Sequence, residues 1–231
     1  MKKVKITPSM LASDHGNLRQ EVQRVQEWGS DGLHIDVMEP EAVEDLGFTP
    51  RMAKAVQECC KLPVEYHMML KDYRKGMLLF KGLYMEELVM QYETAREPSV
   101  LLWEALLREA GNYAARAGLS FAPDTQIQGK EELLFLCSTV ILMGVEPGRG
   151  GSRFQEKTIE KIKELVRIRK QMNMPQLVIA VDGGLNLENA RRCIMAGADK
   201  LIIGTALFNH SNPAEMLHKI KEDKGESNDL L

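Results

Sequence analysis

Four side chains that often bind divalent metal ions occur at the ends of three predicted strands. His34 and Asp36 belong to one strand, His67 to a second and Asp182 to a third. Two imidazoles and two carboxylates suit Zn²⁺, Fe²⁺ or Mn²⁺. His34 and Asp36 are two residues apart, so on a strand both point to the same face. Each residue alone is a weak indication, but together the four define a candidate metal site.

Composition excludes several classes of function. Hydrophobic residues make up 44% and charged residues 27% of the 231 residues, and the formal net charge is −3. These values are typical of a soluble globular protein, and without a basic surface we expect no nucleic-acid or membrane partner. The apolar runs are too short to span a membrane, and the first residues lead into a strand pattern rather than a signal peptide.

The cysteines indicate a reducing compartment. Cys59 and Cys60 are adjacent, Cys137 and Cys193 are isolated, and no C-x-x-C pair occurs. This pattern is typical of spectator thiols rather than of zinc or disulfide units. We therefore expect a cytoplasmic enzyme.

Short β-rich runs alternate with helical patterns along the whole chain. The alternation predicts one domain over residues 1–231, with 223–231 as a charged, frayed tail. Eight strand–helix units in this length favour a TIM barrel over a doubly wound sheet, which would need a Gly-rich fingerprint after an early strand. We predict strands at Val4–Ser9, Gly32–Val37, Pro63–Leu70, Leu88–Tyr92, Leu119–Ala122, Thr139–Val145, Leu177–Val181 and Lys200–Gly204.

Helices are expected between these strands, and Gly118 fits the C-terminal stop of one of them. Barrel active sites are assembled at the C-terminal ends of the strands, where the candidate metal ligands are expected. The predicted helices are Asn17–Gly29, Pro50–Cys60, Trp103–Ala117, Lys130–Cys137, Phe154–Met172, Leu187–Gly197 and Pro213–Glu222.

Glycine-rich turns follow the last three predicted strands and indicate a phosphate site. Glycine lets the backbone approach an anion closely, and successive N–H groups or a helix N-terminus supply donors. Barrels often bind phosphate near the loops after strands seven and eight. Arg149 in the first of these turns could add charge or could point to solvent. The expected contacts are Gly148, Gly150, Gly151, Gly183, Gly184, Gly204 and Thr205.

In these motifs the chain resembles the ribulose-phosphate 3-epimerase family. Six segments over nearly the whole length resemble family motifs, and their common order makes the resemblance specific. The segments are Pro8–Asp14, His34–Met38, His67–Met69, Met143–Gly151, Val181–Gly184 and the pair Gly197–Asp199 with Gly204–Phe208.

The resemblance implies a metal-dependent 3-epimerase that acts on a ketose phosphate, D-ribulose 5-phosphate first of all. His34, Asp36, His67 and Asp182 would bind one divalent ion, which could be Zn²⁺, Fe²⁺, Mn²⁺ or Co²⁺. Asp36 and Asp182 would be the acid/base groups on opposite faces of the sugar, one removing the C3 proton and the other delivering a proton. A carboxylate is a weak base for a carbon acid, so the enediolate between these steps would have to be strongly stabilised. The metal would stabilise it as a Lewis acid.

The resemblance also implies substrate contacts and an oligomer. Ser9 and His67 match residues close to the substrate, and Met38, Met69 and Met143 match methionines that exclude water, although many of the chain's 14 methionines must simply fill core. Family members commonly form dimers or hexamers, so we expect a homo-oligomer. Four aromatic residues could pack at its interface or in the core: Phe48, Phe80, Tyr84 and Tyr92.

Two departures from the family pattern leave the substrate open. After Met38 the segment Glu39–Pro50 is longer and more acidic than in relatives, with Pro40 in place of a glycine. Gln91 stands where relatives often carry a histidine. The same epimerisation on another ketose phosphate, such as a hexulose 6-phosphate, is therefore the first alternative.

Two further alternatives change the chemistry. A lyase on the same kind of barrel would want a lysine beside the reacting carbon, and Lys71, four residues after His67, is the nearest candidate. A non-catalytic sugar-phosphate binder would keep the glycine turns but would have no need of both Asp36 and Asp182.

Overall fold

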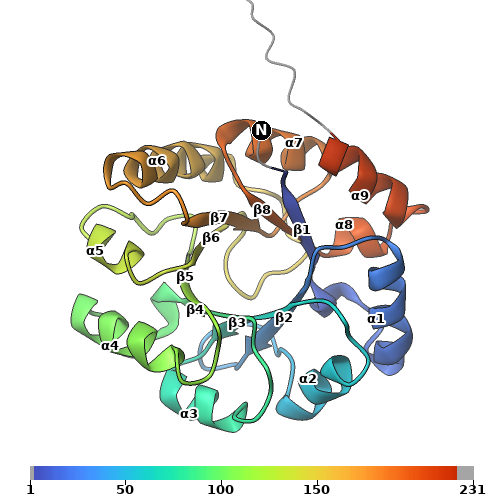
Figure 1. Cartoon of the computed structure of the whole chain (residues 1–231), viewed down its shortest axis with the longest axis horizontal. Helices are drawn as coiled ribbons and strands as arrows, with labels where there is room; N and C mark the ends of the chain where they lie inside the picture. The colour runs from blue at the N-terminus through green and yellow to red at the C-terminus, as the bar shows by residue number, and fades with distance from the viewer. Residues whose placement is uncertain (1–2, 223–231) are drawn as a thin grey trace, which may run out of the picture.

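The computed structural model describes residues 3–222, in which eight parallel strands form a barrel surrounded by helices (Figure 1). Each strand pairs with its neighbour in the order β1-β8-β7-β6-β5-β4-β3-β2, and a bridge between Ser9 and His34 brings β1 beside β2. The predicted TIM barrel is confirmed, whereas the predicted tail lies outside the described residues. The strands are β1 (Lys5–Pro8), β2 (Leu33–Met38), β3 (Val64–Met69), β4 (Glu87–Gln91), β5 (Ala117–Phe121), β6 (Thr139–Met143), β7 (Val178–Asp182) and β8 (Lys200–Ile203).

Helices cover the outside of the barrel in chain order (Figure 1). Several begin at a residue whose side chain accepts a hydrogen bond from the first turn: Thr49, Asp72, Ser99 and Asn186. The α-helices are α1 (Leu18–Glu27), α2 (Pro50–Gln57), α3 (Tyr73–Leu79), α4 (Val100–Ala110), α5 (Glu131–Leu134), α6 (Lys157–Gln171), α7 (Leu187–Ala196), α8 (Thr205–Phe208) and α9 (Pro213–Glu222).

The prediction for Gly118 was wrong. Helix α4 ends at Ala110, and Gly118 lies inside β5 rather than at a helix end. A Cβ atom at Gly118 would lie 2.2 Å from the carbonyl oxygen of Thr139 on β6. The glycine is therefore needed where two strands approach closely, a contact that the local sequence does not reveal. Helix α3, which falls between two predicted strands, and the short helix α8 were not predicted.

The strands direct alternate side chains to opposite sides of the barrel wall. Outward side chains such as Ile35 and Tyr66 belong to the main core, between the barrel and the helices. The polar residues His34, Glu65 and Glu87 are register partners on β2, β3 and β4 and share the inner face. The interior therefore holds charged groups beside a small, separate apolar cluster formed by Val89, Ile141, Met143, Ala180 and Ile202.

Three of the four aromatics considered for an interface pack within the chain. Phe48 and Phe80 are buried, and the ring of Tyr92 stacks on Trp103 with centroids 5.5 Å apart. Tyr84 is exposed. The homo-oligomer and the cytoplasmic location stay predictions. Within residues 3–222, every helix is too short or too polar to cross a membrane.

Candidate active site and metal centre

The four predicted metal ligands meet at the C-terminal end of the barrel. Each offers one ligand atom, and these atoms lie within 4.8 Å of one another. His34 Nε2 is 3.2 Å from Asp36 Oδ1 and 3.7 Å from Asp182 Oδ2. His67 Nδ1 is 3.5 Å from Asp36 Oδ1 and 3.7 Å from Asp182 Oδ2. Strands β2, β3 and β7 thus bring two imidazoles and two carboxylates to one point.

A buried nitrogen of His67 shows that this donor set fits a metal ion. The other ring nitrogen, Nε2, lies 2.9 Å from Gln91 Oε1. Gln91 donates through its own amide to Glu93, so its oxygen is left to accept from His67. In the neutral ring, His67 Nδ1 is then a buried acceptor with no hydrogen-bond partner among the described residues. Such an atom is costly unless it is satisfied, and a divalent cation would satisfy it.

The electrostatics of the cluster also favour a cation. Burial lowers the pKa of His34, but the carboxylates of Asp36 and Glu65 outweigh it and raise that pKa well above its usual value. The pKa of His67 is likewise raised, because Asp182 and Asp36 outweigh its burial. Burial raises the pKa of Asp36, but the two histidines hold it well below its usual range. The carboxylates therefore stabilise positive charge between them.

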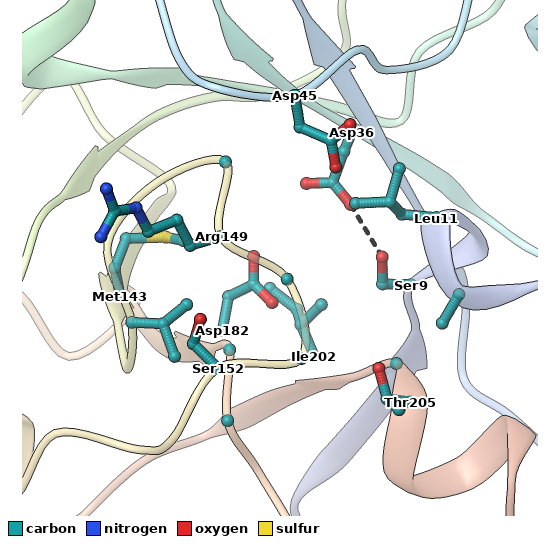
Figure 2. Close-up of a pocket in the computed structure, with 18 of the residues that line it drawn as sticks. Ser9, Leu11, Asp36, Asp45, Met143, Arg149, Ser152, Asp182, Ile202 and Thr205 are labelled. Carbon is teal, nitrogen blue, oxygen red and sulfur yellow. Dashed lines mark hydrogen bonds between the residues drawn. The ribbon is translucent and has the colours of Figure 1, made fainter.

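A cavity of about 430 Å³ opens above the cluster and has the size of a small-molecule site. In Figure 2, the side chains of Asp36 and Asp182 point into this space. His34 and His67 are fully buried beneath it and do not line it, so the geometry gives no support to His67 as a direct substrate contact. The other predicted substrate residues all line the cavity: Ser9, Met38, Met69, Met143, Gly148, Gly150, Gly151, Gly183, Gly184, Gly204 and Thr205.

Ser9 and two glycines help to shape the cavity. Ser9 Oγ donates to Asp36 Oδ2 at 2.7 Å and so fixes this carboxylate. Gly183 and Gly184 have φ of 96° and 67°, which favour glycine. A Cβ atom on Gly184 would lie 2.7 Å from the backbone nitrogen of Phe154. These glycines are thus required by the loop packing itself as well as by any bound anion.

The loop after β2 contributes to the cavity wall. Asp45 from this loop lines the cavity, although we did not predict it as a site residue (Figure 2). Glu44 accepts two hydrogen bonds from Arg149, at 2.5 and 3.0 Å, and so joins this loop to the loop after β6. Arg149 is half exposed and pairs with Glu44, while Lys71 does not line the cavity. The lyase alternative thereby loses its nearest lysine.

The sequence predicted no site role for several other residues around the cluster. Glu65 contacts the outer nitrogen of His34, and Gln91 contacts that of His67. Glu65 is two residues before His67 on β3, and Gln91 is two residues after Val89, the register partner of His67 on β4. Because side chains alternate along a strand, both face the inside of the barrel. The two-residue spacing of Glu65 and His67 was visible in Val64-Glu-Tyr-His67, but Glu65 matched no motif. Leu11 and Ser152 also line the cavity.

Fold and site together define a TIM-barrel protein with a buried His/Asp cluster below a glycine-lined cavity. The model of the ribulose-phosphate 3-epimerase family matches residues 5–208. The chain is 31% identical over 221 residues to ribulose-phosphate 3-epimerase of Bacillus subtilis, covering 96% of this chain and 100% of the relative. It is 32% identical over 225 residues to the Chlamydia pneumoniae enzyme of the same name, with 97% and 96% covered. The chain belongs to the ribulose-phosphate 3-epimerase family, which confirms the predicted isomerase class.

Solved structures of other enzymes share the fold. 3-Hexulose-6-phosphate synthase from Salmonella typhimurium matches with a TM-score of 0.67 at 18% identity, covering 94% of this chain and 97% of the other. KGPDC from Streptococcus mutans matches with a TM-score of 0.66 at 13% identity, with 97% and 100% covered. At these identities the likeness extends to the barrel alone.

Proposed function

We propose that this chain is a metal-dependent epimerase that inverts C3 of a ketose phosphate, converting D-ribulose 5-phosphate to D-xylulose 5-phosphate. The observation that carries the proposal is the position of Asp36 and Asp182. Both carboxylates reach the floor of the cavity from different strands, β2 and β7, and both belong to the histidine cluster. Inversion at carbon needs one group to remove a proton and a second to deliver one from the other face. The family membership supports the same reaction.

Asp36 and Asp182 would exchange roles with the direction of the reaction. In one direction the first takes the C3 proton while the second, protonated, returns a proton to the opposite face, and the reverse reaction swaps them. The hydrogen bond from Ser9 holds Asp36 in place. A divalent ion held by His34, Asp36, His67 and Asp182 would supply a Lewis acid that stabilises negative charge on the C2 and C3 oxygens.

The remaining lining residues would exclude water and hold the phosphate. Met38, Met69 and Met143 are buried beside the carboxylates and present apolar surface to the sugar. The phosphate would lie at the glycine turns after β6, β7 and β8, where Gly204 and Thr205 begin the short helix α8. Removing water strengthens the interactions of the two carboxylates with charge that develops on the sugar.

Asp45 bears on whether the sugar phosphate has five or six carbons. It adds a polar group to the cavity lining from the loop after β2, so a hexulose 6-phosphate with a further hydroxyl is the second candidate. The cavity of about 430 Å³ has room for either sugar.

The test is NMR in heavy water with the metal-loaded protein and D-ribulose 5-phosphate. We expect deuterium at C3 together with D-xylulose 5-phosphate, and loss of both after chelation. Exchange with only a hexulose 6-phosphate would change the substrate, and exchange with neither sugar would refute the epimerase. Asp36→Asn and Asp182→Asn should each lower kcat by about 10²–10⁴-fold. If both variants keep full turnover, the two-base mechanism is wrong.

A further inference from the structure

The two histidines of the cluster have outer hydrogen-bond partners of different charge. His34 Nδ1 lies 2.8 Å from the carboxylate oxygen Oε1 of Glu65, whereas His67 Nε2 lies 2.9 Å from the amide oxygen of Gln91. Both rings are fully buried, so neither can turn to an alternative partner in solvent. The inner nitrogens therefore differ in type: Nε2 of His34 and Nδ1 of His67 face the carboxylates.

Glu65 is itself held by a charged network inside the barrel. Thr7 Oγ1 donates to Glu65 Oε1 at 3.2 Å, and Lys200 Nζ donates to Glu65 Oε2. Lys200 also donates to Glu87 Oε2 at 2.8 Å. Glu65, Glu87 and Lys200 are 5%, 2% and 6% exposed, and they line a second cavity of about 420 Å³ rather than the one above the cluster.

This network determines which nitrogen of His34 carries its hydrogen. An ionised carboxylate can only accept, so Nδ1 of His34 must be the donor to Glu65. The ammonium of Lys200 donates to Glu65 Oε2 and so compensates the negative charge of this buried carboxylate, which keeps it ionised. With its hydrogen on Nδ1, the ring would be neutral once a cation lies between Asp36 and Asp182, and Nε2 would present its lone pair to that cation.

We propose that Glu65, held by Lys200, is a positioning residue that fixes His34 as a metal ligand through Nε2. The inference rests on the proposed metal site and adds the residues that would orient one of its ligands. A carboxylate behind a ligating imidazole fixes the ring and makes its free nitrogen more basic, and removing such a partner typically lowers metal affinity about 10–100-fold. Gln91 orients His67 without adding charge, so the two imidazoles would bind with unequal strength.

The first test compares the Zn²⁺ affinities of three proteins by competition with a chromophoric chelator. Glu65→Gln keeps the size of the side chain and removes its charge, and we expect about 10–100-fold weaker binding. Glu87→Gln is the matched control, because Glu87 binds the same lysine but does not contact a histidine. Its affinity should stay within about twofold of the parent, as for a change that leaves the ligands' own partners intact.

Equal affinities of the parent and Glu65→Gln would overturn the proposal, as would an equal loss in Glu87→Gln. If the parent itself binds no Zn²⁺, the proposed metal site fails and takes this inference with it. Bound Zn²⁺ without epimerase activity would instead refute the proposed reaction and leave the inference testable by affinity alone.

A second measurement needs no variant at Glu65. Two-bond ¹H–¹⁵N spectra of the Zn²⁺-loaded parent, labelled at histidine, report which ring nitrogen carries the hydrogen. We expect Nδ1–H for His34 and Nε2–H for His67, with the remaining histidines, His15, His210 and His218, assigned by single substitution. Nε2–H on His34 would refute the proposal even if Glu65→Gln did not fold.

Discussion

Single residues in this site serve two purposes at once. Asp36 faces the cavity, accepts a hydrogen bond from Ser9 and lies against both histidines of the cluster. Gly184 similarly lines the cavity and allows the loop after β7 to pack against Phe154. A substitution at either position would therefore alter both ligand binding and the local structure, and an experiment must separate the two effects.

Gly184→Ala should destabilise the protein even without ligand. Its φ of 67° costs a non-glycine residue about 1–2 kcal/mol, and the new Cβ would overlap the Phe154 backbone. We expect a loss of about 2 kcal/mol or more in the free energy of unfolding measured with urea. Gly150→Ala is the control, because the nearest atom to its new Cβ would be Leu11 Cδ2, at an ordinary contact distance of 3.7 Å. Equal stability of the two variants would contradict the packing account of Gly184.

At the scale of elements, helix α6 is tied to the loop after β5 by a buried lysine. Lys161 Nζ donates to the carbonyl oxygens of Ala122 and Thr125, at 2.7 and 2.6 Å. Only 9% of Lys161 is exposed, and burial lowers its pKa to about 8. The helix is thus fixed against the barrel wall by a cation that is costly to keep charged.

Lys161 should make stability rise with pH in an alkaline window. Between about pH 8 and the unfolded value of 10.5, the unfolded chain keeps a proton that the folded chain has lost. The free energy of unfolding therefore increases as the pH rises from about 8 to 10.5, and this gain is absent below pH 8, where the lysine is protonated in both states. Relative to Lys161→Met, the parent should gain about 1–3 kcal/mol from pH 7.5 to pH 10 in urea unfolding. A constant difference would show that Lys161 titrates normally.

Across the whole molecule, the metal site would link three strands that are far apart in sequence. Its four ligands come from β2, β3 and β7, and the barrel places β7 well away from the other two along the sheet. An ion bound there only in the folded state must stabilise the entire barrel, because the unfolded chain has no such arrangement of ligands.

Metal removal should therefore lower the melting temperature. At a free ion concentration 100 times Kd the ion contributes about 2.7 kcal/mol, and chelation should lower Tm by roughly 5–10 °C for a chain of this size. His67→Gln should show little or no response to Zn²⁺ or to a chelator. The same Tm for loaded and chelated parent, by differential scanning fluorimetry, would contradict a specific site.

The sequence predicted the barrel well because the wall repeats one local pattern. Each of the eight strands was found within a few residues of its observed position, since β-branched runs and glycine turns are local signals. Gly118 was assigned wrongly because the signal at this position is not local. The need for glycine at 118 comes from Thr139, which is adjacent only across the β5–β6 pairing.

For the site, the sequence by itself predicted the candidate ligands and the strands that carry them, and it determined the family to which the chain belongs. Motif order was sufficient for this, because His34, Asp36, His67 and Asp182 lie within short motifs that resemble those of the family and follow the same order along the chain. Only the tertiary structure showed that both histidines lie beneath the cavity and that Glu65 and Lys200, 135 residues apart, meet behind one of them. Contacts of this kind arise when the barrel brings β3 and β8 together across its interior, and no local pattern encodes them.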